Sequence, residues 1–408
     1  MIKRVYLDYA AATPVDPRVK KAMDEFSALG FANPAGLHEE GLFAKRALEL
    51  ARKTIADFIG AKAPEIIFTS STTESNNLAI LGVARANREF GRHLITTASE
   101  HVSVLNVFKQ LEKERFEVTY LSVDEFGIVS ADMVAKAIRP DTILVSVIFA
   151  SNEIGSINPI KEIGQMIKSK SPSFAKASEG KLYFHTDAAQ AAPHIKINAE
   201  DFGIDLMSFS SSKMYGPKGA AALYIKHGIS INPIIFGGSQ ENGMRPGTQD
   251  VAGIIGFEKA VEIIKSESEA EDRKLQAMRD KIISEIKSAF PDVLINGPPT
   301  SHQGGTTEGR SHPTERLANN INFSIPGIKG EELVVAMDMA GFAISTRSAC
   351  DTKNAEPPHV IKSLGRSDED AWGAVRITLG RYTSAEDIDI FSKVLIENIG
   401  KLKSKRHS

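Results

Sequence analysis

The chain has 408 residues, enough for about two or three domains, and an ordinary globular composition of 42% hydrophobic and 25% charged residues. Its formal net charge of -2 argues against direct nucleic-acid or membrane-surface binding, both of which favour a basic protein. No apolar run is long enough to span a bilayer, and Asp8 interrupts the region where a signal peptide needs apolar residues. The single cysteine, Cys350, excludes an intramolecular disulfide and a cysteine metal cluster, and predicts a reducing, cytoplasmic setting.

Short apolar, β-rich runs alternate with longer amphipathic segments through the first two-thirds of the chain. The predicted strands cover residues 65–69, 93–97, 117–121, 142–149, 182–186, 204–209 and 221–225. Helical patterns lie between them, for example at residues 39–59 and 160–168. This alternation predicts an α/β fold with a largely parallel sheet and helices on both faces. Because ligands of such sheets gather at the carboxyl ends of the strands, the residues that follow each strand are the site candidates.

The character of the chain changes near residue 258. Residues 258–290 form one long, charged helical pattern, which would bridge into a second α/β unit. That unit would contain strands at residues 319–324 and 375–378 and a closing helix at 385–399. The pattern therefore predicts a second, smaller C-terminal domain.

The domain boundaries follow from these patterns. We expect a large domain over residues 16–258 and a small domain over residues 259–408, with residues 1–15 packing on the small domain. Two stretches rich in Ser, Gly, Pro and Thr, residues 169–180 and 298–315, are expected to be loop insertions at the surface.

A hydroxyl-rich stretch follows the first of the main strands. Ser71 and Glu74 have the spacing of a capping box, and a helix start there is a sufficient structural explanation. The functional alternative is that Thr72 and Thr73, at the N-terminus of that helix, form a seat for a phosphate group.

Asp187 ends a buried strand among alanines, where a carboxylate is costly unless it has a partner. It could cap the following helix, or pair with a cationic heterocycle such as the pyridinium nitrogen of pyridoxal phosphate. Gln190 would then be placed to hydrogen-bond the same ligand. His101 and Asn152 also follow strands, and each taken alone is typical of a structural histidine and a turn residue.

Residues 210–219 leave a buried strand through three serines, a lysine and a Gly-Pro turn. The simple interpretation is that Lys213 reaches solvent at the strand end. The alternative is that Lys213 is a Schiff-base lysine.

The order of these signals is more informative than any one of them. A phosphate seat, a histidine, an asparagine, an aspartate and a lysine all follow strands of one sheet, and the chain resembles the cysteine desulfurases. These are pyridoxal-phosphate enzymes of fold type I, in the class V aminotransferase branch. The matching segments are residues 7–14, 33–38, 73–77, 100–104, 152–155, 185–190, 213–219, 247–249, 348–350 and 379–381.

The resemblance implies a role for each matched residue. Lys213 would hold pyridoxal 5'-phosphate through a Schiff base and move protons, Asp187 would keep the pyridine nitrogen protonated, and His101 would stack on the ring as an acid or base. Arg381 would bind the substrate carboxylate as a bidentate pair. Asn33 and Asn152 are the other implied contacts to the substrate. The implied contacts to the cofactor are Thr72, Thr73, Asn152, Gln190, Ser210 and Ser212. Thr248 would reach the cofactor from the second subunit of a homodimer.

Cys350 determines the reaction type that the resemblance implies. Free cysteines are commonly buried and inert, but this one lies in a small, polar segment that is typical of a loop. Its thiolate would take the sulfur of L-cysteine, leaving L-alanine and a persulfide. A sulfur-acceptor protein, either an iron–sulfur scaffold or a relay for tRNA thiolation, would be the partner. The segment up to Pro357 and Pro358 resembles the subgroup with an extended catalytic loop.

Two positions depart from the family pattern. Ser212 stands where the family usually has a histidine that contacts the phosphate, and Arg347 stands where it usually has a glycine. Alternatives to a cysteine desulfurase are a selenocysteine lyase or another class V lyase, or a non-catalytic paralogue that acts as a binding partner. The two departures are the features that favour the paralogue.

Overall fold

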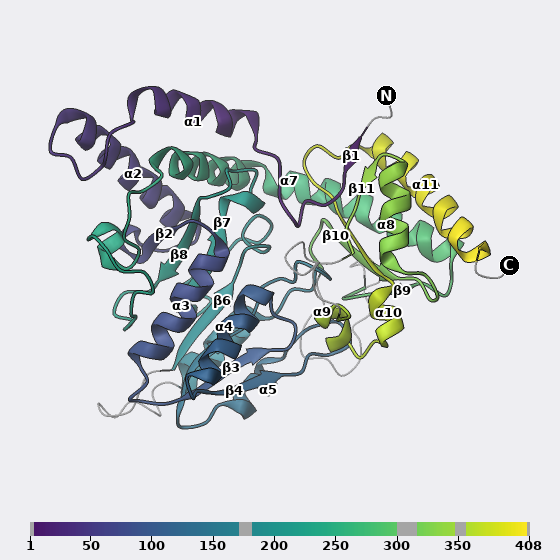
Figure 1. Ribbon diagram of the computed structural model, residues 1–408, viewed down its shortest axis with the longest axis horizontal. Helices are drawn as coiled ribbons and strands as arrows, with labels where there is room; N and C mark the ends of the chain where they lie inside the picture. The colour runs from purple at the N-terminus through teal and green to yellow at the C-terminus, as the bar shows by residue number, and fades with distance from the viewer. Residues whose placement is uncertain (1–3, 171–181, 300–315, 347–355, 406–408) are drawn as a thin grey trace.

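A seven-stranded sheet forms the centre of the larger half of the molecule, in a computed structural model that describes residues 4–170, 182–299, 316–346 and 356–405 (Figure 1). The strand order is β2-β8-β7-β6-β5-β3-β4, and only β8 among the neighbours is antiparallel, to both β7 and β2. The strands are β2 (Ile66–Thr69), β3 (His93–Thr97), β4 (Glu117–Leu121), β5 (Thr142–Ser146), β6 (Tyr183–Asp187), β7 (Leu206–Ser210) and β8 (Ala221–Ile225). The predicted fold class and these strands are confirmed, with strand ends that differ from the prediction by at most three residues.

Helices cover both faces of this sheet because each buried strand carries apolar side chains on both sides. Leu206 of β7 points into the core under α3 and α4, and the next residue, Met207, points into the core on the opposite face. The helices of the first face are α3 (Thr72–Ala86) and α4 (Val102–Lys113). Those of the second face are α1 (Pro17–Leu29), α2 (Glu39–Phe58), α5 (Ala131–Ala137), α6 (Ile160–Lys170) and the first half of α7 (Val251–Ala289).

A second hydrophobic core surrounds an antiparallel sheet of order β12-β10-β9. Its elements are β9 (Leu294–Ile295), β10 (Asn320–Ser324), α8 (Gly330–Met339), β11 (Phe342–Ala343), β12 (Ala374–Thr378) and α11 (Ala385–Ser404). The short helices α9 (His359–Ser363) and α10 (Asp368–Trp372) pack in a separate small core that includes Ile154. The helix α7 (Val251–Ala289) joins both cores, because its buried residues up to Ile264 belong to the first core and those from Leu275 belong to the second. The predicted boundary at residue 258 falls inside this helix, and the division into two domains stays a prediction.

The N-terminal segment contacts both halves of the molecule. The strand β1 (Val5–Tyr6) pairs in parallel with β11, and the carbonyl oxygen of Leu7 accepts a hydrogen bond from the Thr378 amide (2.8 Å). Further on, the Thr13 amide donates to the Ser212 carbonyl oxygen (3.1 Å). The structure thus places residues 5–7 against β11 and β12, and Thr13 on the turn that carries Lys213.

The two expected surface insertions, residues 169–180 and 298–315, fall largely outside the described residues, because residues 171–181 and 300–315 are not described. No helix within the described ranges is both long and apolar enough to cross a bilayer.

His185 lies at the centre of the seven-stranded sheet and is fully buried. Its Nδ1 bonds to the Ser146 hydroxyl (2.8 Å), and its Nε2 bonds to the Ser208 hydroxyl (3.1 Å). Both partners are neutral, and burial lowers the pKa of His185 to about 3. The folded protein therefore keeps this imidazole neutral down to a pH at which the unfolded chain would already bind a proton.

This difference predicts a measurable loss of stability in acid. Between pH 7 and pH 5, His185 becomes protonated in the unfolded state but stays neutral in the folded state. The free energy of unfolding therefore falls by about 2 kcal/mol from this residue alone. We expect urea unfolding of His185→Asn at the two pH values to show a smaller acid loss than the wild type by about that amount. The exposed His227→Asn is the matched control and should keep the wild-type acid loss. An equal acid loss in His185→Asn and the wild type would contradict the prediction.

Candidate active site

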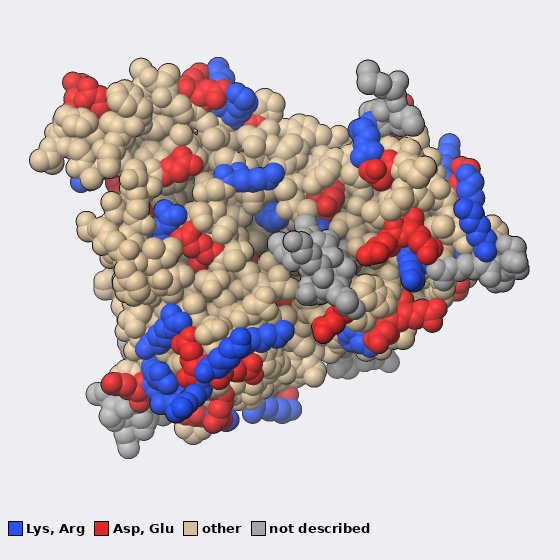
Figure 2. All heavy atoms as spheres, in the orientation of Figure 1, with Lys and Arg blue, Asp and Glu red and all other residues tan. Residues whose placement is uncertain are grey.

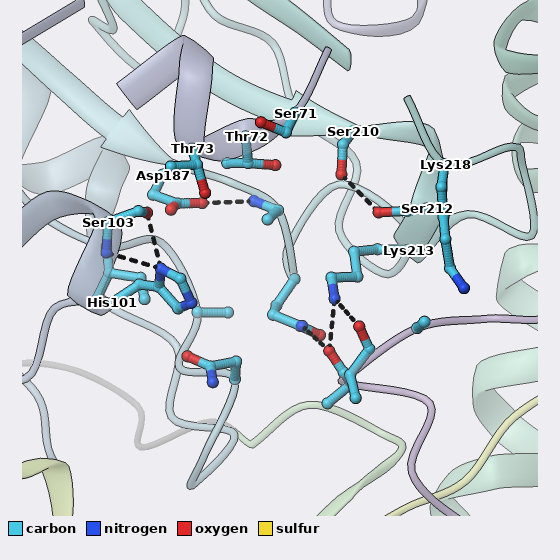
Figure 3. Close-up of a pocket in the computed structure, with 18 of the residues that line it drawn as sticks. Ser71, Thr72, Thr73, His101, Ser103, Asp187, Ser210, Ser212, Lys213 and Lys218 are labelled. Atoms are coloured by element: carbon cyan, nitrogen blue, oxygen red, sulfur yellow. Dashed lines mark hydrogen bonds between the residues drawn. The ribbon is translucent and has the colours of Figure 1, made fainter. Parts of the chain in front are cut away.

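A cavity of about 320 Å³ lies where β6 and β7 end, beside the N-termini of α3 and α4 (Figure 3). Its walls come from segments far apart in the sequence, including the N-terminal residues 10–12. The structure brings the following predicted site residues to its lining: Thr72, Thr73, His101, Asn152, Asp187, Gln190, Ser210, Ser212 and Lys213.

Lys213 projects into this cavity from a short turn that follows β7. Its ammonium donates hydrogen bonds to the carbonyl oxygens of Ala10 (2.8 Å) and Ala11. The turn continues into Tyr215, whose φ of 60° lies in the left-handed region that is unfavourable for a side chain of this size. The Tyr215 amide donates to the Thr13 hydroxyl (2.8 Å), so the N-terminal segment fixes both the turn and the lysine.

Asp187 forms the other polar wall and is 4% exposed. One carboxylate oxygen accepts a hydrogen bond from the Ala189 amide (3.0 Å), and the other accepts from the Asn76 side-chain amide (2.8 Å). The Asn76 amide also donates to the Ser103 hydroxyl (2.9 Å). No salt bridge to Asp187 occurs within the part of the chain that is described, so this buried carboxylate is bound by neutral donors and faces the cavity.

His101 is the N-cap of α4, and its ring lies beside Asp187 and Ser103 (Figure 3). Its Nδ1 accepts from the Ser103 amide (3.1 Å), which requires a lone pair on Nδ1 and places the proton of the neutral ring on Nε2. Burial lowers the pKa of His101, the cations Lys213 and Arg376 lower it further, and Asp187 opposes them. The histidine is therefore a neutral donor at pH 7, with Nε2 as the atom that is left for a ligand.

Hydroxyl groups gather at the opposite end of the cavity. Ser71 caps α3 by accepting a hydrogen bond from the Glu74 amide (3.1 Å), as the capping box predicts. The Glu74 carboxylate returns to the Ser70 amide (2.7 Å) in place of the Ser71 amide, one residue earlier than the motif requires. Ser71, Thr72 and Thr73 line the cavity at the N-terminus of α3, a position that favours an anion.

Two further predicted residues are tied by backbone contacts. The side-chain amide of Gln190 donates through Nε2 to the Ala10 carbonyl oxygen (3.0 Å), which also accepts from Lys213. The Asn152 carbonyl oxygen accepts from Arg376 (3.2 Å), which leaves its side-chain amide for the cavity.

The structure does not bring Asn33, Thr248 or Arg381 to the cavity. Asn33 is exposed, and its side-chain oxygen accepts from the Ala35 amide (2.9 Å). Thr248 is exposed as well. The predicted nucleophile Cys350 and its neighbour Arg347 lie outside the described residues.

Arg381 belongs to a separate network of buried charges. Its guanidinium donates to Asp16 (2.7 Å) and to Glu271 (2.9 Å), and it lies 4.4 Å above the ring of Tyr215. Hydrogen bonds from Arg18, and then from Arg381, hold the pKa of Asp16 well below its usual range. The substrate role predicted for Arg381 thus has no support in the geometry, because its donors already face two carboxylates.

The guanidinium that lines the cavity is that of Arg376 on β12, a residue that the sequence reasoning missed. It is 1% exposed and forms a 2.7 Å salt bridge to Asp8. Its Nε has no hydrogen-bond partner. An arginine between Val375 and Ile377, in an otherwise apolar strand, was the signal that could have identified it, because a buried charge is costly without a partner.

Asn76, Ser103 and Lys218 also line or support the cavity without having been predicted. No group of three or more His, Cys, Asp or Glu residues that could hold a metal ion occurs among the residues that the structure describes.

Comparison with known proteins places this site in a family. Residues 5–391 match the family described as aminotransferase class-V. The cysteine desulfurase IscS of Dictyoglomus turgidum is 46% identical over 404 residues, which cover 99% of this chain and 96% of the relative. The corresponding protein of Methanosarcina thermophila is 43% identical, with 98% and 93% coverage.

Solved structures agree with this result. A NifS-like protein superposes with a TM-score of 0.87 at 34% identity, covering 98% of this chain and all of the other. A cysteine desulfurase from Thermococcus onnurineus NA1 superposes with a TM-score of 0.82 at 25% identity, with 98% and 95% coverage. The chain is therefore a member of the aminotransferase class-V family, and within it of the cysteine desulfurases. The resemblance that the sequence motifs carried is confirmed.

The charge network of Arg381 predicts a structural effect of its removal. In Arg381→Met, Asp16 and Glu271 each lose a buried cationic partner, so we expect the free energy of unfolding to fall by about 3 kcal/mol in a urea titration. Arg85→Met is the matched control, because Arg85 pairs with Glu114 at the surface and its loss should cost under about 1 kcal/mol. Equal losses in the two variants would show that the Arg381 network does not contribute as a buried ion pair.

Proposed function

We propose that the protein is a pyridoxal-phosphate-dependent cysteine desulfurase, which converts L-cysteine into L-alanine and leaves the sulfur as a persulfide on Cys350. The observation that carries the proposal is that the amine of Lys213 and the buried carboxylate of Asp187 line the same cavity. The names of the relatives support the substrate, since they are cysteine desulfurases at 43% to 46% identity.

The residues of the cavity fit pyridoxal 5'-phosphate. Its volume of about 320 Å³ is within the range of cofactor pockets. Asp187 is a buried carboxylate held by neutral donors, which suits a protonated pyridine nitrogen. Ser210, Thr72 and Thr73 would hold the phosphate, and the neutral ring of His101 would lie against the pyridine ring.

When bound, the cofactor supplies an electron sink for the bonds at the substrate Cα. Lys213 is the base of the site, because its amine enters the cavity and can take the proton from Cα and return it. The Nε2 proton of His101 is available as a second donor beside it. Hydrogen bonds from Lys213 to the Ala10 and Ala11 carbonyl oxygens hold its side chain at the cavity.

Arg376 binds the substrate carboxylate in this proposal, in place of Arg381. Its guanidinium lines the cavity, and its Nε carries a proton without an acceptor. Asp8 holds one side of the fork (2.7 Å), and the Asn152 carbonyl oxygen holds the other nitrogen (3.2 Å). A substrate carboxylate that enters the cavity would accept hydrogen bonds from the Arg376 guanidinium, which is already buried and held in orientation.

Cys350 carries out the sulfur transfer. Its thiolate attacks the Sγ atom of cysteine, and the Cβ–Sγ bond breaks with its electron pair on the alanine fragment. That fragment takes a proton at Cβ, and the sulfur remains on Cys350 as a persulfide. A sulfur-acceptor protein, such as an iron–sulfur scaffold or a relay for tRNA thiolation, then removes it. We assign the reaction to the cytoplasm, because a reduced thiol is required.

A homodimer accounts for the exposed residues around α1 and α2. Large apolar side chains are exposed there, including Leu29 (68%), Phe31 (80%) and Leu37 (91%), and Phe236 (85%) is exposed as well. Figure 2 shows that the lobe formed by α1 and α2 carries few charged side chains on the face drawn. A second copy covering these residues could bring the exposed Thr248 of one subunit to the phosphate of the other.

The first test is made on purified protein with added L-cysteine and a reductant. We expect a yellow protein that releases alanine and sulfide in equal amounts. Lys213→Ala should lose the absorbance band of the bound cofactor, and Cys350→Ala should keep the band and form no persulfide. A yellow protein that releases alanine only from selenocysteine would favour the lyase alternative, and a protein that stays colourless with added cofactor would favour the non-catalytic paralogue.

The assignment of Arg376 predicts a kinetic difference between two arginines. Arg376→Lys keeps the charge and loses the bidentate fork, so KM for cysteine should rise by at least about ten-fold, with a smaller change in kcat. Arg381→Lys should change KM by less than about two-fold, since its partners are Asp16 and Glu271. The cofactor absorbance band serves as the folding control for both variants. A rise in KM for Arg381→Lys alone would restore the role predicted from the sequence.

A further inference from the structure

Among the described residues, the side chains that form the hydroxyl-rich end of the cavity are uncharged. Ser210 and Ser212 bond to one another through their hydroxyls (3.1 Å), and Ser71, Thr72 and Thr73 lie opposite them (Figure 3). All of these groups are neutral donors. A phosphate monoester carries a charge of about −2 at neutral pH, and neutral donors alone leave that charge uncompensated in a partly enclosed site.

Three cationic side chains of the described residues line the cavity, and two of them already have hydrogen-bond partners. Lys213 donates to the Ala10 and Ala11 carbonyl oxygens, and Arg376 is paired with Asp8. Lys218 is the third. It forms no hydrogen bond or ion pair with any residue in the described ranges, and its side chain is exposed at the cavity edge.

The position of Lys218 is set by the backbone. The turn from Ser211 to Ala220 is closed by hydrogen bonds from the Ser211 amide (3.1 Å) and hydroxyl (2.9 Å) to the Ala220 carbonyl oxygen. This closure returns Lys218 to the side of the cavity where Ser212 lies, as Figure 3 shows. The lysine stem has four rotatable carbons, so an ammonium that starts from solvent can reach an anion there at a small cost in rotamer freedom.

We propose that Lys218 is a cofactor-binding residue that supplies the positive charge for the phosphate group of pyridoxal phosphate. The inference rests on the proposed function, because it requires that this cofactor occupies the cavity. Lys218 compensates the phosphate charge from the rim, and the hydroxyls and the first turn of α3 supply the directional hydrogen bonds.

The test compares two ligands that differ only in the phosphate. Cofactor-free protein is titrated with pyridoxal 5'-phosphate and with pyridoxal, and binding is followed by the absorbance of the ligand. Lys218→Met should weaken pyridoxal 5'-phosphate by about five- to ten-fold and leave pyridoxal unchanged. Lys218→Arg should retain the wild-type preference for the phosphorylated ligand. The wild-type affinity should also fall more steeply with added salt than that of Lys218→Met.

Lys196→Met is the matched control, because Lys196 is an exposed lysine that does not line the cavity. It should bind both ligands as the wild type does. An unchanged ratio of the two affinities in Lys218→Met overturns the inference and leaves the proposed function intact. A wild-type protein that binds neither ligand overturns both.

Discussion

The arrangement of the site depends on the hydrogen bonds between the Lys213 ammonium and the carbonyl oxygens of Ala10 and Ala11. An amine at the end of a buried strand needs acceptors, and here they come from a segment about two hundred residues away in the sequence. That segment is itself held at both ends, by the pairing of β1 with β11 and by the hydrogen bond from Thr13 to Ser212. The lysine therefore has a fixed position only when both sheets and the N-terminal segment are assembled.

The two buried arginines near the cavity illustrate how partners determine the role of a charge. Arg381 donates hydrogen bonds to the carboxylates of Asp16 and Glu271, and so joins α7 to the loop that follows β12. Arg376 has Asp8 as its acidic partner, together with a backbone carbonyl and an Nε that has no acceptor. The protein therefore offsets only part of the free-energy cost of burying the Arg376 charge, and an anionic ligand would offset the rest. Tyr215 and Arg381 support the lysine turn, while Arg376 lines the cavity.

The cavity separates two kinds of polar chemistry. At one end, the buried carboxylate of Asp187 and the neutral ring of His101 are linked through hydrogen bonds of Asn76 and Ser103, which fix their relative positions. At the other end, hydroxyls and backbone amides present hydrogen-bond donors, and Lys218 stands at the rim. This polarity matches a ligand with a cationic ring at one end and an anionic group at the other, and Lys213 lies between them (Figure 3).

The sequence by itself determined the seven main strands and the order of the residues that follow them, because periodicity and turn residues are local properties. It also determined that Asp187, His101 and Lys213 share one site, since the carboxyl ends of parallel strands meet at one edge of a sheet. It did not distinguish Arg376 from Arg381, because the difference lies in partners such as Asp8, which is 368 residues from Arg376 in the chain. The same holds for Asn76 and Lys218, whose roles depend on which face of a helix or turn meets a distant segment. Only the tertiary structure decided these, because pairing across the two sheets is a long-range property that local pattern does not encode.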